Sequence, residues 1–196
     1  MRNVFIINGG QIFGASQGQL NKTIAEITEK FMQNKGYEVR LFDINDEYDE
    51  FEQLENIISA DLIIWHIPIW WFQLPHNLKK YIDTVFNHGQ GKLFESDGRS
   101  RTNPQVNYGR GGLLHDKKYM VTTSWNAPEG AFTLKGEIMN QTSVDDGVLF
   151  GFHKTMEFTD MKRLESFHFY DVYKNLSQEG FEEYKKEYIK HLERIC

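Results

Sequence analysis

The stretch that decides the fold is Ala60-Asp61-Leu62-Ile63-Ile64-Trp65-His66-Ile67-Pro68-Ile69-Trp70-Trp71-Phe72-Gln73-Leu74-Pro75. Its residues 62–67 form an apolar run, which is typical of a strand buried on both faces of a parallel sheet. Residues 70–72 follow as a loop of three aromatic side chains, a composition unusual for a solvent-exposed turn. Pro75 then opens a helical pattern, because a proline at a helix start loses no hydrogen bond. A strand, an aromatic loop and a helix in this order predict a binding surface for a nucleotide-like ligand at the carboxyl end of a sheet.

The remaining sequence alternates strand-like and helix-like segments. Strands are expected at residues 3–8, 37–42, 62–67, 117–123 and 165–171. Helical patterns separate them, and Asp49 and Ser177 are expected to cap two of the helices. The helix after residue 49 is expected to turn Phe51, Leu54 and Ile58 toward the core. This alternation predicts an α/β protein with a doubly wound, five-stranded parallel sheet of order 2-1-3-4-5 and helices on both faces.

Length and composition restrict the function classes. The 196 residues are 40% hydrophobic and 26% charged, which suits one domain over residues 1–196. The N-terminus leads into a strand without an apolar leader, so we expect a cytoplasmic protein without a membrane span. A net charge of −6 argues against a nucleic-acid partner. One cysteine, seven histidines without ligand spacing and no Gly-x-Ser-x-Gly motif argue against a metal site and a serine hydrolase.

Two segments interrupt the alternation. Residues 126–146 carry a weak pattern and are expected to contain a short helix, before a further helix at residues 147–158. Residues 87–116 form a polar, glycine-rich connection. A connection this long inside one domain is more often functional than idle. We therefore expect residues 87–116 to contribute to the functional site.

Three loops are expected to meet, because they leave the carboxyl ends of the first, third and fourth strands. These loops span residues 9–18, 66–74 and 124–130. The first ends in residues 16–19 at a helix start, where free N–H groups and the helix dipole favour a phosphate. The hydroxyls of Ser16 and Thr23 could add hydrogen bonds to it. An ordinary Gly/Ser turn with a helix cap is the alternative interpretation.

The second and third loops share an aromatic residue placed at the end of a strand. Trp70 and Trp71 offer a wall for a planar ring, and packing against a neighbouring subunit is the alternative. In the third loop, Trp125 lies among small residues, and backbone N–H groups nearby could reach the polar edge of a flavin. A plain turn is the alternative there. Together the three loops predict one site for a ligand with a phosphate and a flat ring.

Six motifs resemble a known family, the flavodoxin-like NAD(P)H:quinone oxidoreductases, and are closest to its MdaB (modulator of drug activity B) group. The motifs are Ile6-Ile7-Asn8-Gly9, Ser16-x-Gly18-Gln19-Leu20-Asn21, Pro68-Ile69-Trp70-Trp71, Leu78-Lys79-Lys80-Tyr81-Ile82-Asp83-x-Val85-Phe86, Ser96-Asp97-Gly98-Arg99 and Trp125-Asn126-Ala127-Pro128. Each motif is weak alone, but six in order over nearly the whole chain are specific. The resemblance implies a flavodoxin-like fold and an FAD-binding homodimer that reduces quinones with NADPH.

The resemblance also assigns roles to residues of this chain. It implies that the pyrophosphate is held by Ser16, Gln17, Gly18, Gln19, Leu20, Asn21, Lys22 and Thr23. It implies that the isoalloxazine ring is held by Pro68, Ile69, Trp70, Trp71, Ser124, Trp125, Asn126 and Ala127. Tyr108 would border the flavin and is the best candidate for a proton donor. We expect the tryptophans and Tyr108 to wall a narrow cleft, and the N–H groups of residues 126 and 127 to face the flavin N1–O2 edge.

The implied chemistry belongs to the cofactor, because the protein positions the ring first against nicotinamide and then against quinone in a ping-pong cycle. A flavodoxin-type electron carrier is the alternative from another class, and an azo- or nitro-compound reductase is the alternative among enzymes. The length beyond a minimal five-stranded domain and the aromatic loops favour the enzyme. Preference for NADPH is expected if Arg99, Arg101 and Arg110 bind the extra phosphate, unless they pair with carboxylates instead.

Overall fold

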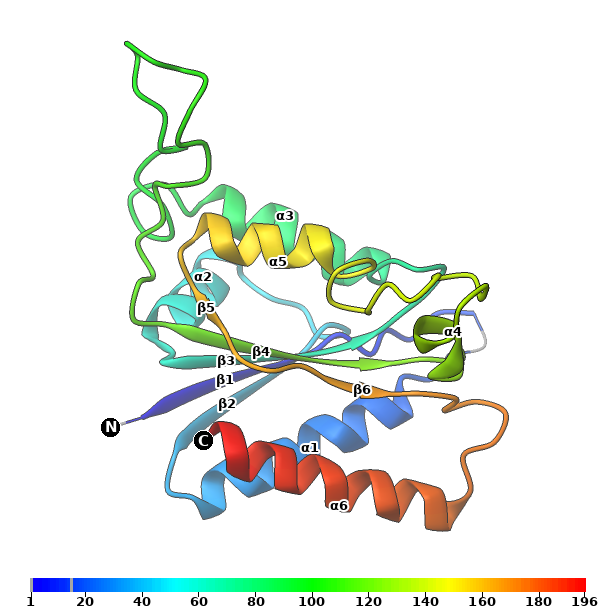
Figure 1. Cartoon of the computed structure of the whole chain (residues 1–196). Helices are drawn as coiled ribbons and strands as arrows, with labels where there is room; N and C mark the ends of the chain where they lie inside the picture. The colour runs from blue at the N-terminus through cyan, green and yellow to red at the C-terminus, as the bar shows by residue number, and fades with distance from the viewer. Residues whose placement is uncertain (1, 15) are drawn as a thin grey trace.

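The computed structural model, which describes residues 2–14 and 16–196, contains a central sheet with helices on both faces (Figure 1). The strands are β1 (Asn3–Asn8), β2 (Glu38–Asp43), β3 (Leu62–Pro68), β4 (Lys118–Ser124), β5 (Lys162–Arg163) and β6 (Phe167–Phe169). The helices are α1 (Gln19–Asn34), α2 (Glu50–Ser59), α3 (His76–Asn87), α4 (Gly130–Thr133), α5 (Phe150–Phe158) and α6 (Gln178–Ile195). The first loop includes residue 15, which lies outside the described residues.

The sheet is parallel and its strands follow the order β2-β1-β3-β4-β5, which confirms the predicted topology. The single fifth strand predicted at residues 165–171 is wrong in detail, because two short strands, β5 and β6, both pair with β4. Between them the chain leaves the ladder, and the Ser166 hydroxyl donates a hydrogen bond to Asp145 instead. The fifth position of the sheet is therefore divided at Ser166.

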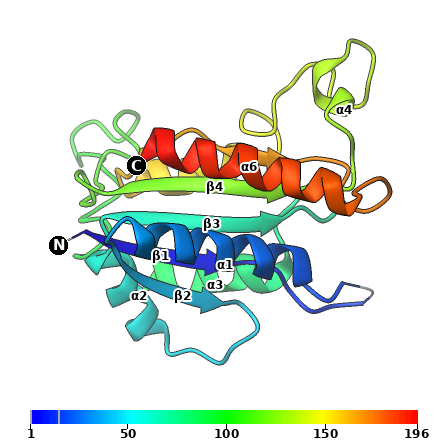
Figure 2. The ribbon, with the colours of Figure 1, turned by 90° about the horizontal axis from the view of Figure 1, so that it is seen from below.

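Two helical layers cover the sheet. Helices α1 and α6 lie on one face, while α2, α3 and α5 lie on the other (Figures 1 and 2). Trp65 of β3 is fully buried on the second face, between the rings of Tyr81 and Phe152. Tyr188 of α6 is fully buried on the first face, where its hydroxyl lies 2.8 Å from that of Thr28. In the described part of the chain, no helix combines the length and apolarity that crossing a bilayer requires.

Side-chain caps set the starts of α2 and α6. The Asp49 carboxylate accepts hydrogen bonds from the N–H groups of Phe51 and Glu52, at 3.0 and 2.9 Å. The Ser177 hydroxyl accepts one from the N–H of Gly180 at 3.1 Å. Both caps were predicted from the sequence and both are confirmed, because each side-chain oxygen satisfies donors that a helix start leaves free.

The inward orientation predicted for Phe51 is wrong. Leu54 is fully buried as expected and Ile58 is half-buried against the core, whereas the Phe51 side chain is 57% exposed. Phe51 lies in the first turn of α2, at the rim of the helix layer, where its ring packs 4.5 Å from that of His88. Helical periodicity predicts the direction in which a side chain points, but not how far the neighbouring helix extends. Next to Phe51, the neighbouring helix α3 has already ended, and His88 is the residue that follows it.

The connection between α3 and β4 is organised and projects from the body of the molecule (Figure 1). Its base is fixed where the Leu113 N–H donates to the Leu93 carbonyl and the Leu114 N–H donates to the Thr159 carbonyl, both at 2.9 Å. Thr159 follows α5 directly, and β4 begins just after the connection. The connection therefore lies at the amino-terminal end of the parallel strands, opposite the loops that follow β1, β3 and β4.

Two substitutions in α2 test this packing. Leu54→Ala should lower the free energy of unfolding by about 2–5 kcal/mol, because it leaves a cavity in the core. Phe51→Ala in the same helix should cost less than about 1 kcal/mol, because the ring is largely exposed and touches only one other ring face. Urea denaturation followed by far-ultraviolet circular dichroism measures both values. Equal losses in the two variants would contradict the described position of Phe51.

Candidate functional site

The structure brings together the three loops that follow β1, β3 and β4. Parallel pairing aligns Asn8 with His66 and Pro68 with Ser124, so the three strands end at one edge. The backbone N–H of Gly9 donates to the His66 carbonyl at 2.8 Å. The Ser124 hydroxyl donates to the Asn21 side-chain oxygen at 2.9 Å, which joins the third loop to the start of α1. This edge contains every predicted site residue except Tyr108.

The first loop is held by buried amide side chains. Gln11 is 2% exposed, and its side-chain oxygen accepts from the N–H of Asn77 at 3.1 Å, in the first turn of α3. Its amide nitrogen lies 2.7 Å from Nε2 of His76. Asn45 accepts from the Ile12 N–H at 2.8 Å and donates to the Gly10 carbonyl at 3.0 Å. The loop is therefore anchored to both α3 and the end of β2.

The start of α1 leaves backbone donors without partners. Its N-cap is Gly18, whose φ of 66° lies in the left-handed region, and no described side chain caps this end. A Cβ on Gly18 would lie 2.4 Å from the Gly10 carbonyl oxygen, so only glycine fits here. The N–H groups of residues 19–21 have no acceptor among the described residues. A helix start of this kind attracts a phosphate group.

The hydroxyl protons expected at this helix start are used within the chain. Ser16 donates to the Gln11 carbonyl at 3.3 Å, and Thr23 donates to the Gln19 carbonyl at 3.0 Å. The expectation that these hydroxyls turn to a bound phosphate stays a prediction. The donors that remain are backbone N–H groups, which depend on the turn at Gly18 and not on side chains.

The aromatic loop is a tight reverse turn. The N–H and carbonyl groups of Trp70 and Gln73 exchange two hydrogen bonds, at 3.0 and 2.9 Å. The central residues, Trp71 and Phe72, have φ values of 50° and 60°. Bulky residues rarely occupy this region, and such strain concentrates at functional sites. The turn leaves Trp71 94% exposed, while the Trp70 ring stays half-buried, 5.9 Å from the ring of Phe13.

Trp125 does not form an open wall, contrary to our expectation. Its side chain is only 3% exposed, because it packs 4.7 Å from the Phe132 ring and its indole N–H donates to Thr123 Oγ1 at 2.7 Å. The carbonyls of residues 125 and 127 accept from the N–H groups of Val172 and Asp171. Within the described chain the N–H groups of residues 126 and 127 have no acceptor. The Trp125 side chain thus packs on the core side of this loop, and the N–H groups of residues 126 and 127 are the two donors left without an acceptor in the described chain.

Two buried polar side chains lie beneath these loops, and sequence reasoning did not identify their arrangement. Asn21 is 4% exposed, and its amide nitrogen has no partner among the described residues. His66 is fully buried beside Thr122, and burial lowers the pKa of His66 to about 3. The His66 imidazole is therefore neutral and inaccessible, so it is unsuited to exchanging protons with a ligand.

Tyr108 lies at the opposite end of the sheet, so it does not border the three loops of its own chain. Its side chain is 70% exposed and its ring is 5.8 Å from that of Phe158, at the end of α5. The Arg99 guanidinium lies 5.6 Å from the same ring and donates to Asp97 at 2.8 Å. The alternative interpretation of Arg99, pairing with a carboxylate, is therefore the observed one. The predicted topology already implies this position, because a connection from a helix to the next parallel strand runs at the amino-terminal ends of the strands. The expectation that Tyr108 borders the flavin came from the family resemblance and not from the fold of one chain.

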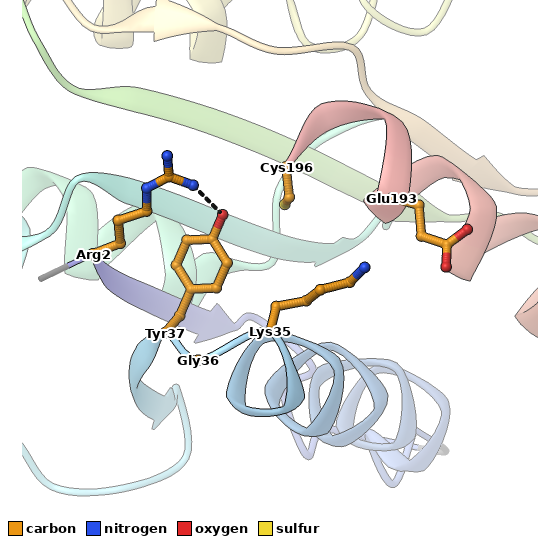
Figure 3. Close-up of a pocket in the computed structure, with 6 residues that line it drawn as sticks. All are labelled: Arg2, Lys35, Gly36, Tyr37, Glu193 and Cys196. Atoms are coloured by element: carbon orange, nitrogen blue, oxygen red, sulfur yellow. Dashed lines mark hydrogen bonds between the residues drawn. The ribbon is translucent and has the colours of Figure 1, made fainter.

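A small cavity of about 290 Å³ also lies at the amino-terminal end of the strands (Figure 3). It is lined by Arg2, Lys35, Gly36, Tyr37, Glu193 and Cys196. The Arg2 guanidinium donates to the Tyr37 hydroxyl at 3.1 Å, as Figure 3 shows. None of the predicted site residues lines this cavity. In the described ranges, no three His, Cys, Asp or Glu side chains are grouped so that they could hold a metal ion.

Comparison with known sequences gives a match to the family described as having a flavodoxin-like fold, over residues 2–192. The chain is 40% identical to the NADPH:quinone oxidoreductase MdaB of Haemophilus influenzae over 194 residues, which is 98% of each protein. Among solved structures, the general stress protein 14 of Treponema denticola in complex with FMN has a TM-score of 0.71 and 19% identity, covering 100% of this chain and 98% of that one.

An azoreductase from Bacillus anthracis is also similar in structure. Its TM-score is 0.60 at 17% identity, and the alignment covers 100% of this chain and 97% of the azoreductase. Likeness at this level of identity establishes the shared fold alone. The near-complete match to the Haemophilus protein is the comparison that bears on the chemistry of the three loops.

A pair of glycine substitutions tests the phosphate end of the site. Gly36→Ala should cost about 1–2 kcal/mol of stability, because its φ is 82° but a Cβ would meet no atom within 4 Å. Gly18→Ala should cost more and also weaken flavin binding at least about tenfold, since its Cβ would displace the Gly10 carbonyl and the turn. Urea denaturation and titration of flavin fluorescence measure the two effects. Equal flavin affinity in both variants would contradict the assignment of the α1 start.

Proposed function

We propose a function for this chain from the premise that it belongs to the flavodoxin-like fold family and, within it, to the quinone oxidoreductases of the MdaB group. The chain is an oxidoreductase. Its proposed reaction is the two-electron reduction of quinones by NADPH, with FAD bound at the three loops. The observation that carries this proposal is the 40% identity over 98% of both chains to an NADPH:quinone oxidoreductase.

The phosphate end of the site fits a dinucleotide flavin. The N–H groups of residues 19–21 point from a helix start without acceptors in the described chain, and the side-chain amide of Asn21 is buried without one. A pyrophosphate would satisfy the backbone donors of residues 19–21 and gain from the helix dipole. Ile12 and Phe13, 58% and 59% exposed, extend an apolar surface beyond the helix start. This surface favours FAD over FMN, because FAD has an adenosine to cover it.

The ring end of the site fits an isoalloxazine. The half-buried Trp70 and the residues before it offer an apolar surface, and the N–H groups of residues 126 and 127 are free within the described chain. When bound, the flavin supplies two-electron transfer between nicotinamide and quinone. Residues 126 and 127 would donate hydrogen bonds to the N1–O2 edge, where negative charge grows on reduction. Donors fixed in position stabilise this charge without reorganisation.

The homodimer belongs to the same proposal. Trp71 is 94% exposed at one end of the sheet, and Tyr108 is 70% exposed on the projecting connection at the other end. A partner subunit would bury both, and its own connection could bring a tyrosine and arginines to the flavin of the first subunit. In this arrangement Tyr108 acts as proton donor across the interface, and Arg101 and Arg110 are available to the extra phosphate of NADPH.

Cofactor content and turnover test the proposed reaction. Purified protein should release FAD on heating, and it should oxidise NADPH when a benzoquinone or naphthoquinone is added. NADH should be used less efficiently, because it lacks the phosphate that the arginines would bind. Chromatography of the released flavin and absorbance at the nicotinamide band measure these outcomes. Release of FMN alone would overturn the cofactor, and a flavin-loaded protein without quinone-dependent turnover would favour an electron carrier.

A tyrosine pair tests the dimeric site. Sedimentation should show a dimer at micromolar concentration. Tyr108→Phe should reduce kcat by about 100-fold, because it removes the proposed proton donor. Tyr173→Phe is the matched control, because Tyr173 is 80% exposed and belongs neither to the three loops nor to the connection that contains Tyr108. It should leave kcat unchanged. A monomeric protein with full activity would contradict the dimer, and unchanged kcat in Tyr108→Phe would remove its role as proton donor.

A further inference from the structure

A buried chain of polar side chains lies beneath Trp125, on the face of the sheet that α5 covers. Its first link is the indole N–H of Trp125, which donates to Thr123 Oγ1 at 2.7 Å. Its second link joins Thr123 Oγ1 to Nδ1 of His168, also at 2.7 Å. Thr123 and His168 are register partners on β4 and β6, so the sheet itself sets this contact. The His168 side chain is only 16% exposed.

The chain continues to Asp145, in the turn before α5. One carboxylate oxygen of Asp145 accepts from His153 Nε2 at 2.9 Å and from the Ser166 hydroxyl at 2.8 Å. The other oxygen lies 3.9 Å from Nε2 of His168. The remaining ring nitrogen of His153 lies 2.9 Å from the Tyr119 hydroxyl. A single carboxylate therefore connects the α5 layer, the gap between β5 and β6, and the side chain that pairs with Thr123.

The hydrogen bonds favour one protonation state of His168. An indole nitrogen only donates, so Thr123 Oγ1 accepts from Trp125 and keeps a second lone pair and its own proton. When His168 is neutral with its proton on Nε2, Nδ1 is an acceptor that takes the Thr123 proton. Protonated His168 would instead donate from Nδ1 to the second lone pair of Thr123 Oγ1, which turns the Thr123 proton away. The orientation of the hydroxyl beneath Trp125 thus depends on the charge of His168.

The surroundings keep His168 neutral and Asp145 charged. Burial lowers the pKa of His168, and the charge of Asp145 only partly offsets this effect. Burial also opposes the charge of Asp145, but the hydrogen bonds from His153 and Ser166 lower the pKa of that carboxyl. The charged and titratable groups around His168 are Asp145 and His153 on the α5 side, His191, Glu183, Glu187 and Tyr184 on α6, and Glu129 and Tyr170 in the adjoining loops.

We propose that Thr123, His168 and Asp145 are positioning residues that hold the Trp125 indole, and through it the N–H groups of residues 126 and 127, at the edge of the bound ring. The proposal rests on the flavin site proposed above. Within the described chain these three side chains make no hydrogen bond to the N–H groups of residues 126 and 127, so their effect on those groups passes through Trp125. The hydrogen bond from Thr123 to His168 is present while His168 is neutral, and it reverses as the pH falls through the lowered pKa of His168.

The first test follows the Trp125 indole proton in the protein without flavin. In Thr123→Val, which keeps the shape but removes the hydroxyl, this proton should exchange with water at least about tenfold faster, because its acceptor is gone. Thr123→Ser restores the oxygen and should restore the protection. Nuclear magnetic resonance of protein labelled at the tryptophan nitrogens measures both. Equal protection in Thr123→Val and the wild type would overturn the proposal.

The second test isolates His168 by pH. In the wild type, the Trp125 indole resonance should shift as the pH is lowered below the ordinary titration range of histidine, because burial lowers the pKa of His168. His168→Gln should abolish the shift, because a glutamine oxygen can accept from Thr123 at every pH. His191→Gln is the matched control and should keep the shift. His191 is buried against β6, the strand that contains His168, but it does not touch Thr123. A shift that survives in His168→Gln would overturn the proposal.

The third test connects the network to the flavin. Thr123→Val should weaken the binding of reduced flavin about tenfold more than that of oxidised flavin, which lowers the two-electron potential by about 30 mV. Thr123→Ser should keep the wild-type potential. If the wild type binds no flavin, the proposed function fails and with it the role at the ring, while the exchange test still decides the hold on Trp125. If the wild type binds flavin and Thr123→Val has the same two-electron potential as the wild type, only this inference fails.

Discussion

The structure depends on the parallel pairing of β1, β3 and β4. Parallel strands point the same way, so their carboxyl ends meet at one edge, and the register places Asn8 beside His66 and Pro68 beside Ser124. Every loop that follows these strands must therefore begin within a few ångströms of the next. The amino-terminal ends receive the other connections, including the long one at residues 88–117. One hydrogen-bond pattern thus divides the molecule into a binding edge and an edge of connections.

Backbone conformation, more than side-chain chemistry, supplies the donors at the binding edge. Gly18 adopts a left-handed conformation that leaves the start of α1 without a side-chain cap among the described residues, and the turn at Trp71 and Phe72 places two bulky residues in the same unusual region. The turn at Trp71 and Phe72 costs free energy that the packed sheet and helices must offset, whereas a glycine adopts the left-handed region without steric strain. The result is a site built from N–H groups and ring surfaces, which suits a cofactor that carries its own reactivity.

Buried polar side chains beneath the loops fix these donors in place. Gln11 joins the first loop to α3, Asn21 joins α1 to Ser124, and Thr123 supports Trp125. Each of these side chains is buried, so a lost hydrogen bond at any of them would leave another polar atom unpaired. Loops that would otherwise be mobile are thereby held by the same requirement that stabilises a core. The positions of the loops at the site are therefore fixed by the polar side chains buried beneath them.

The sequence by itself determined the fold class, the strand order, the helix caps at Asp49 and Ser177, and the family, because apolar periodicity and cap chemistry are local properties of the chain. It did not determine that Phe51 lies at a rim or that Trp125 is buried. Those outcomes depend on which neighbours each segment meets. Only the tertiary structure decides them, because burial and direction are properties of the packed layers and are not encoded in any one segment.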